Sequence, residues 1–295
     1  MRCSLPGKFQ KEFNLKKDKL YKLDIACVGD FVEIEMNDDG TGVIQSIREK
    51  KNYISRKAPR IKGASRRGER LEQVIASNIN NICIVTSVKS PSFNHKMVDR
   101  LIVAGESAHV KVILVINKID LDKNDSIAEW KALYESLGYP VILTSTLNMT
   151  GIEEVKRNFE GSVSLLWGQS GVGKSSLLNT MYPDLELKTG EISTFTNKGT
   201  HTTVTSVLIP VEESTFVIDT PGVREIDPYG IKEEDLCHYF IEFAPYINEC
   251  RFNTCTHSHE PGCAVVEAVE QNKISAERYE SYINLLNTIE DDMIF

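Results

Sequence analysis

Between two apolar segments, Val163-Ser164-Leu165-Leu166-Trp167 and Leu177-Leu178, the chain reads Gly168-Gln169-Ser170-Gly171-Val172-Gly173-Lys174-Ser175-Ser176. This spacing matches G-x-x-x-x-G-K-[ST] in the context that the motif requires: a short buried strand, a glycine-rich turn and the start of a helix. The glycines let backbone N–H groups curl around phosphate, and the helix N-terminus adds donors and a positive dipole end. We expect Lys174 to reach the β- and γ-phosphates of a nucleotide and the Ser175 hydroxyl to bind Mg²⁺. The alternative is a glycine-rich turn before an ordinary helix.

A second motif indicates which base is bound. Asn117-Lys118-Ile119-Asp120 follows the run Val112-Ile113-Leu114-Val115-Ile116, which lacks polar alternation and therefore predicts a fully buried parallel strand. Open α/β sheets bind ligands at the carboxyl ends of such strands. An Asp carboxylate accepts both N1–H and the exocyclic amine of guanine, a donor pair that adenine does not present. The two motifs together predict GTP, and an adenine-specific P-loop ATPase or kinase is the alternative.

The two motifs occur in the reverse of the order found in most GTPases, with the guanine motif first. The two loops must be close in space but need not follow a fixed order in sequence. A parallel sheet whose chain begins and ends at different points can therefore bind the nucleotide in the same way. The sequence predicts a circularly permuted α/β P-loop GTPase domain with a mostly parallel sheet. Its expected strands lie at residues 81–86, 112–116, 141–143, 163–167 and 215–218. Thr144 and Ser145, after the third of these strands, are expected to contact the guanine oxygen through backbone amides.

Two later segments supply the remaining contacts to Mg²⁺ and γ-phosphate. Residues 190–203 are rich in Thr, Ser and Gly, as expected of a switch that orders around these groups. In this segment Thr203 or Thr202 would give Mg²⁺ a hydroxyl ligand. The last expected strand leads to Asp219-Thr220-Pro221-Gly222, where Asp219 would hold Mg²⁺ through water and the Gly222 N–H would touch the γ-phosphate.

The residue after Gly222 bears on the rate of hydrolysis. Many GTPases place there a Gln that orients the attacking water, whereas this chain has Val223, which cannot bind water by a hydrogen bond. We therefore expect slow intrinsic hydrolysis and assign the positioning of water to His201, the nearest polar candidate in the switch. A partner that orders the switch would raise the rate. The alternative is that His201 is an exposed loop histidine.

A cysteine-rich segment predicts a metal site. Cys250, Cys255, His257 and Cys263 offer three thiolates and one imidazole within a short stretch, a ligand set that suits one structural Zn²⁺. His259 is the competing fourth ligand. Helices are expected at residues 264–270 and 275–289, anchored by the metal because so short a segment has little core of its own.

Composition places the chain in a broad class. Its 295 residues suggest about two domains or one domain with appendages, and 41% hydrophobic with 26% charged residues is typical of globular proteins. No apolar run approaches the ~18 residues of a membrane span, and the N-terminus lacks an apolar signal core. The seven cysteines, an odd number, fit a reducing compartment better than a disulfide framework. We expect a cytoplasmic monomer with no membrane partner.

The charge is unevenly distributed along the chain. The net charge is −8, but residues 1–70 carry 17 Lys and Arg against 10 Asp and Glu, which makes this part the expected polyanion contact. Short strands up to Ile47 suggest an OB-fold, often an RNA-binding fold, with a small structural β-domain as the alternative. Residues 48–70 hold ten Lys and Arg and predict an exposed, flexible basic linker that either contacts RNA phosphates or is only solvated.

These observations divide the chain into four expected parts. They are an OB-fold-like domain at 1–50, a basic linker at 51–72, a permuted GTPase domain at 73–228 and a helical zinc-binding domain at 229–295.

The motifs together resemble one family. N-K-I-D at 117–120, T-S-T at 144–146, the phosphate loop, K-G-T-H-T-T at 198–203, D-T-P-G-V at 219–223 and the cysteine cluster occur in this order. They are similar to those of the bacterial RsgA (YjeQ/YloQ) family of circularly permuted GTPases, over nearly the whole chain. The resemblance implies GTP hydrolysis to GDP and phosphate, stimulated by the small (30S) ribosomal subunit and its 16S rRNA, in late subunit maturation. A GTP-binding RNA scaffold with negligible hydrolysis is the alternative.

The resemblance also implies the same domain order, with an N-terminal OB-fold and a C-terminal zinc domain. Residues 3–9 resemble the second strand region of that OB-fold, so the barrel is expected to lack its first strand. Thr200 stands where the family usually has a basic residue or Gln before the histidine.

Overall fold

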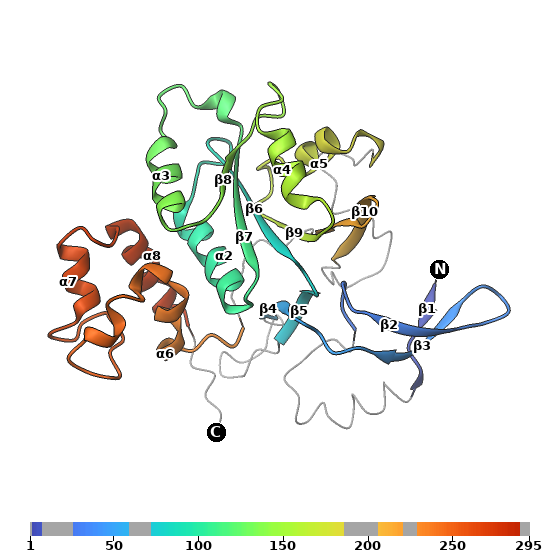
Figure 1. Ribbon diagram of the computed structural model, residues 1–295, viewed down its shortest axis with the longest axis horizontal. Coiled ribbons are helices and arrows are strands. Elements are labelled where there is room, and N and C mark those ends of the chain that lie inside the picture. Colours follow the sequence, from blue (N-terminus) through green and yellow to red (C-terminus); the bar gives the residue numbers. More distant parts are fainter. Residues whose placement is uncertain (1, 8–25, 59–71, 186–205, 221–228, 290–295) are drawn as a thin grey trace, which may run out of the picture.

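The computed structural model describes residues 2–7, 26–58, 72–185, 206–220 and 229–289. At its centre is a six-stranded sheet in the order β10-β11-β9-β6-β7-β8, in which only the edge strand β10 runs antiparallel to its neighbour (Figure 1). The predicted mostly parallel sheet is confirmed, and each expected strand lies in it. The strand bounds are β6 Asn81–Ser87, β7 Lys111–Asn117, β8 Val141–Leu143, β9 Val163–Trp167, β10 Val207–Glu212 and β11 Thr215–Asp219.

Helices cover both faces of this sheet, which explains why its central strands are apolar along their whole length. Ile82 and Ile84 of β6 pack with α2 (His95–Ser107) and α3 (Ala128–Ser136). Cys83 and Val85, the alternate residues of β6, pack with α4 (Ile152–Phe159) and α5 (Lys174–Met181) on the other face. Successive strand residues point to opposite faces, so both sets must be apolar.

The strand order fixes where a ligand can bind. The chain leaves β6 towards β7 but leaves β9 towards β11, although β6 and β9 are direct neighbours. Ligands of open α/β sheets bind outside the carboxyl ends of the strands at such a switch point. The phosphate loop follows β9 and the guanine loop follows β7, so both lie at this edge.

The N-terminal part contains a second, smaller sheet. β1 (Cys3–Ser4), β3 (Gly42–Ile47) and β2 (Val32–Met36) pair in that order, and the turn at residues 37–40 joins β2 to β3 as expected. A closed OB-fold stays a prediction, because residues 8–25 lie outside the described part of the chain.

Part of the expected basic linker is a strand. β4 (Tyr53–Lys57) pairs antiparallel with β5 (Glu72–Ser77), and Arg56 and Lys57 are only 6% and 4% exposed. Arg56 donates two hydrogen bonds of 2.9 and 3.1 Å to the Gln73 side-chain oxygen. The expectation of an exposed linker is wrong for residues 53–57. Ile54 is buried in the core, so the strand that carries it packs against the rest of the protein. The basic residues of 59–71 lie outside the described residues.

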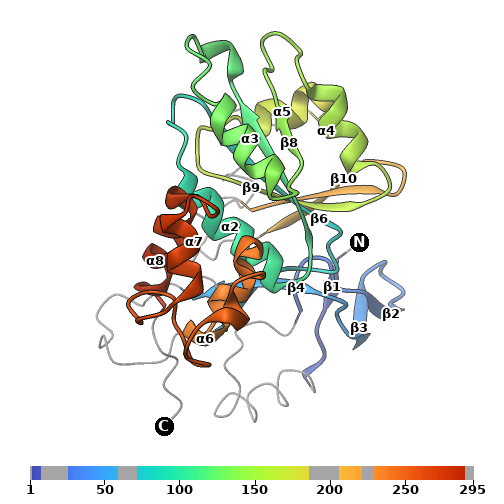
Figure 2. The same cartoon turned by 60° about the vertical axis from the view of Figure 1, so that its left-hand side comes forward.

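The C-terminal part is helical, as predicted. α6 (Glu233–Leu236), α7 (Ala264–Glu270) and α8 (Ala276–Leu286) surround a core to which α2 contributes Val103, and α8 lies beside α2 (Figure 2). α7 has the predicted bounds, and α8 lies within the predicted range. None of the described helices is both long and apolar enough to cross a membrane.

Candidate nucleotide-binding site

The phosphate loop joins β9 to α5 and requires glycine where it begins and ends. A Cβ on Gly168 would lie 2.0 Å from the Val85 carbonyl oxygen, and Gly173 has a φ of +102° at the start of α5. The Lys174 ammonium folds over the loop and donates to the carbonyl oxygens of Gly168 (2.7 Å) and Gln169 (3.0 Å). Burial lowers the pKa of Lys174, and the nearby Asp219 carboxylate opposes this effect. The Lys174 ammonium therefore contacts the backbone of the loop that the motif predicts to bind phosphate.

The guanine loop and the phosphate loop meet directly. The Asn117 side-chain amide donates to the Val172 carbonyl oxygen at 2.9 Å, and a Cβ on Gly173 would lie 2.4 Å from that amide nitrogen. The Lys118 ammonium donates to the Gly171 carbonyl oxygen at 2.6 Å. Two loops that are reversed in sequence therefore converge at one edge of the sheet.

The third expected loop supports the guanine loop from the other side. The Thr144 hydroxyl donates to the Asn117 side-chain oxygen at 3.1 Å, and the Ser145 hydroxyl donates to the Asp120 carboxylate at 2.6 Å. Thr144 and Ser145 are fully buried, whereas Asp120 is half-buried on the short helical turn Ile119–Leu121. These contacts fix the orientation of the carboxylate that would read guanine.

Asp219 ends β11 beside the phosphate loop. It is 1% exposed, and neither carboxylate oxygen has a hydrogen-bond partner among the described residues. Burial raises the pKa of Asp219, and the ammonium of Lys174 opposes the rise. A buried carboxylate without hydrogen-bond donors fits a cation or its water ligands, as expected for the Mg²⁺ of a P-loop protein. Ser175 and Ser176 follow Lys174 directly, in the first turn of α5.

Four expected site residues fall outside the described part of the chain. His201, Thr202 and Thr203 lie in 186–205, and Gly222 lies in 221–228. Their roles stay predictions.

Sequence reasoning missed the loop after β6. The Ser90 carbonyl oxygen accepts a second hydrogen bond from the Lys118 ammonium, and the Ser87 hydroxyl donates to the Pro91 carbonyl oxygen at 2.8 Å. The Val88 N–H donates to the Asn117 carbonyl oxygen at 3.1 Å. β6 lies between the strands that carry the two recognised loops, so strand order is the signal that would have placed this loop at the site.

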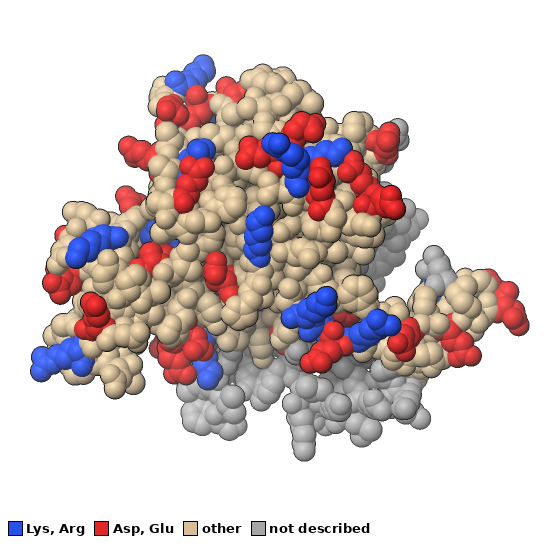
Figure 3. Space-filling view, in the orientation of Figure 1, with Lys and Arg blue, Asp and Glu red and all other residues tan. Residues whose placement is uncertain are grey.

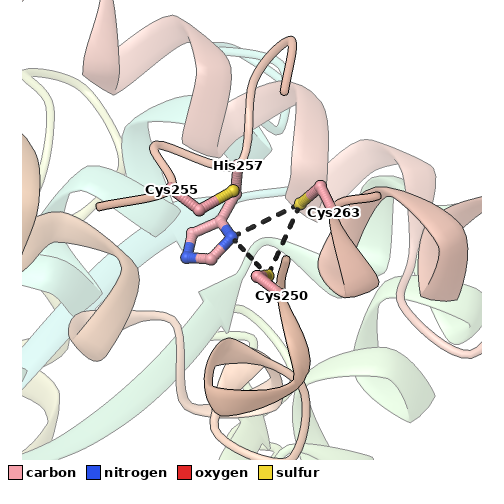
Figure 4. Close-up of side chains that lie close together, drawn as sticks. All are labelled: Cys250, Cys255, His257 and Cys263. Carbon is pink, nitrogen blue, oxygen red and sulfur yellow. Dashed lines mark hydrogen bonds between the residues drawn. The ribbon is translucent and has the colours of Figure 1, made fainter. Parts of the chain in front are cut away.

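The cysteine cluster is assembled in the C-terminal part (Figure 4). One ligand atom from each of Cys250, Cys255, His257 and Cys263 lies within 4.8 Å of the other three. His257 Nδ1 is 3.4 Å from both the Cys250 and the Cys263 sulfur atoms. The competing ligand His259 is exposed and pairs through Nδ1 with the Ser258 hydroxyl, outside the cluster. Three thiol groups and one imidazole at these distances could hold a zinc ion.

The cluster is also supported from outside. The Tyr279 and Tyr282 hydroxyls of α8 donate to the carbonyl oxygens of His257 (2.9 Å) and Thr256 (2.6 Å). These hydrogen bonds hold the backbone of the cluster in place, so α8 and the cluster form one unit.

The comparison with protein families agrees with this geometry. The model of the RsgA GTPase family matches residues 47–229. The chain belongs to this family. It is 41% identical over 268 residues to the small ribosomal subunit biogenesis GTPase RsgA of Phocaeicola vulgatus, covering 90% of this chain and 84% of the relative. It is 40% identical to the RsgA of Chlorobaculum parvum, covering 91% of this chain and 86% of the relative.

Solved structures support the same assignment for the fold. The crystal structure of YjeQ from Thermotoga maritima matches with a TM-score of 0.72 and 32% identity, covering 97% of this chain and 88% of that one. YloQ, described as a circularly permuted GTPase, matches with a TM-score of 0.67 and 27% identity, covering 92% and 83%. The predicted circularly permuted RsgA-type GTPase fold is confirmed.

The contact at Gly173 can be tested by one substitution. Gly173→Ala places a methyl group where the Asn117 amide lies, so the two loops must separate at a cost of about 1–3 kcal/mol. We expect GDP affinity, measured with a fluorescent GDP analogue, to fall by roughly tenfold or more. Gly138→Ala is the matched control, because Gly138 has a φ of +86° but nothing within 4 Å of its Cβ position. Equal GDP affinity in both variants would show that the loop contact does not shape the site.

Proposed function

We propose that this protein binds GTP at the converging loops and hydrolyses it to GDP and phosphate on the small ribosomal subunit, in late maturation of that subunit. The observation that carries the proposal is the direct contact of Asn117 and Lys118 with Val172 and Gly171. The names of the relatives, small ribosomal subunit biogenesis GTPases, supply the partner.

The proposed nucleotide contacts follow the order of the loops. The phosphate loop from Gly168 to Ser176 cradles the phosphates, and Lys174 neutralises their negative charge. The guanine base lies against the loop Asn117-Lys118-Ile119-Asp120, where the carboxylate of Asp120 accepts N1–H and the exocyclic amine. Thr144 and Ser145 close the base site from the neighbouring loop.

The proposed metal chemistry uses the other loops. Ser175 and Thr203, or Thr202 in its place, would hold Mg²⁺ directly, and Asp219 would hold it through water. Bound there, Mg²⁺ would neutralise charge that develops on the phosphates during phosphoryl transfer. His201 positions the attacking water in the complex with the small subunit, since Val223 cannot form a hydrogen bond to water.

The proposed RNA contact rests on the N-terminal parts. On the face drawn in Figure 3, Lys and Arg side chains are interspersed with Asp and Glu side chains. Residues 59–70 hold five of the ten basic residues of the segment 48–70 and one Glu, so these five are the proposed contacts to 16S rRNA phosphates.

We retain the domain bounds 1–50, 51–72, 73–228 and 229–295 as proposals, with strand β4 inside the second. A cytoplasmic monomer is consistent with a ribosomal partner and unpaired cysteines.

Phosphate release tests the proposed activity. We expect GTP hydrolysis to be slow alone and faster with purified small subunits, and ATP to be a poor substrate under the same conditions. His201→Ala should reduce the stimulated turnover by roughly 10²-fold with little change in GTP affinity. Absence of any stimulation would favour the GTP-binding scaffold. Equal hydrolysis of ATP would favour an adenine-specific enzyme, and unaltered turnover in His201→Ala would remove that residue from the mechanism.

Base recognition can be tested at Asp120. Asp120→Asn replaces an acceptor of the guanine amine by a donor, which suits the C2 oxygen of xanthine. We expect affinity for GDP to fall by roughly 10²-fold or more and affinity for xanthosine diphosphate to rise, measured by competition. Asp122→Asn is the control, because the Asp122 carboxylate accepts hydrogen bonds from Ser126 and Ile127 instead. An unchanged preference in Asp120→Asn would mean that Asp120 does not touch the base.

The cysteine cluster is proposed to bind one structural Zn²⁺ through Cys250, Cys255, His257 and Cys263. We expect purified protein to contain about one zinc per chain and cobalt substitution to give tetrahedral thiolate absorption bands. Cys263→Ser should lose the metal and lower the unfolding temperature. Cys237→Ser is the matched control, because both cysteines are 4% exposed but Cys237 lies outside the cluster. Full zinc content in Cys263→Ser would contradict this ligand set.

A further inference from the structure

Helix α2 is shared between the GTPase domain and the C-terminal helical part. Leu101 and Ile102 pack in the core beneath the sheet, whereas Val103 belongs to the core formed by α6, α7 and α8. α8 lies along α2 (Figure 2). A displacement of the C-terminal part would therefore expose one side of α2.

A buried ion network joins the two parts at this seam. The Arg278 guanidinium on α8 is 2.6 Å from the Asp99 carboxylate on α2 and 2.6 Å from the Glu242 carboxylate. The Arg278 and Asp99 side chains are 1% and 0% exposed. The centre of the Phe240 ring lies 4.6 Å from the guanidinium carbon of Arg278. Water is therefore excluded from the charges that hold the seam together.

The network also reaches a second helix of the GTPase domain. The Tyr134 hydroxyl on α3 donates to the same Asp99 oxygen at 2.8 Å. The other Asp99 oxygen is buried without a hydrogen-bond partner among the described residues. Breaking a buried ion pair by removing one partner is strongly destabilising, because it leaves an uncompensated charge. Asp99 therefore depends on Arg278, and the position of α2 depends on the C-terminal part.

The N-terminal end of α2, near Asp99, leads into the nucleotide site. The Asn94 side chain caps α2 by accepting from the Met97 N–H at 3.2 Å, so the preceding loop is tied to the helix. That loop carries Ser90, whose carbonyl oxygen accepts from the guanine-loop residue Lys118, and Val88, which binds the Asn117 backbone. Asp99 lies in the first half of α2, near this end. A shift of α2 would move the backbone that supports the guanine loop.

We propose that docking of the C-terminal helical part and binding of guanine nucleotide are coupled through α2, with Asp99 and Arg278 acting as positioning residues for the guanine loop. The proposal rests on the proposed function, because it requires guanine nucleotide at the site described above. Coupling between two sites is reciprocal in free energy. Bound nucleotide must then stabilise the docking of α8 on α2 by the same free energy by which docked α8 stabilises nucleotide binding.

Hydrogen exchange on the unmodified, zinc-loaded protein tests one direction. GDP should slow amide exchange in α8 as well as in the phosphate loop and α5, because it favours the docked arrangement. Protection of α5 with unchanged exchange in α8 would overturn the coupling. A protein that bound no GDP would contradict the proposed function and the coupling together, so the two failures are distinguishable.

Substitutions test the reverse direction. Asp99→Asn removes the charge from the pair while keeping an acceptor for Tyr134, and it should weaken GDP binding by roughly 5- to 30-fold, within the usual range of coupling energies. Lys96→Met is the matched control. It removes an exposed ion pair of 2.7 Å with Glu280 across the same seam, which contributes little. GDP affinity in this control should stay within about twofold.

A purely structural role gives a different result. It predicts that Asp99→Asn lowers the unfolding temperature and speeds α8 exchange while GDP affinity stays at the wild-type value, and this outcome would overturn the proposal. Tyr134→Phe provides a milder variant in case Asp99→Asn does not fold. It removes one hydrogen bond to Asp99 without leaving a charge unpaired, and it should weaken GDP binding in the same direction. Wild-type affinity in a folded Tyr134→Phe variant would also count against the coupling.

Discussion

The structure depends on the contact between the Asn117 side-chain amide and the backbone of Val172 and Gly173. This contact leaves no room for a Cβ atom at position 173. Asn117 is 1% exposed, so its amide must find partners within the protein. It donates to the phosphate loop and accepts from Thr144, which joins three loops from three strands. Reversing the order of these loops along the chain changes none of these contacts, because the strand order in the sheet, not the sequence order, brings them together.

Much of the fold could be predicted from sequence because its strongest signals are local. Five strands of the central sheet carry a short apolar run, whereas the exposed edge strand β10 was not expected. The phosphate loop, guanine loop and cysteine cluster each lie within one short segment. The failures are non-local. Charge counting placed Arg56 and Lys57 in solvent, but pairing with β5 and burial of Ile54 draw them into the structure. Ser90 carries no motif, and only the position of β6 between β9 and β7 places it beside Lys118.

Buried polar groups play different parts in the two halves of the molecule. In the nucleotide site, Asp219 is buried near Lys174, and its carboxylate oxygens have no hydrogen-bond partner among the described residues, so they are available to a cation. In the C-terminal part, Arg278 has partners for three of its nitrogen atoms, and the pair serves to hold two surfaces in one arrangement. The unpaired oxygens of Asp219 can therefore bind a ligand, whereas the polar groups of Arg278 are already paired within the protein.

The permuted order has a consequence for how the C-terminal part is attached. β11 is the last described strand of the sheet along the chain, so the C-terminal helices follow Asp219 in sequence. Those helices then pack on α2, whose preceding loop supports the guanine loop. The C-terminal part thus follows the Asp219 side of the site along the chain and packs against the helix that leads from the guanine-loop side. In a GTPase of the usual order, a domain appended at the C-terminus would follow the guanine loops instead. Permutation therefore places the C-terminal part after Asp219 in the chain and not after the guanine loops.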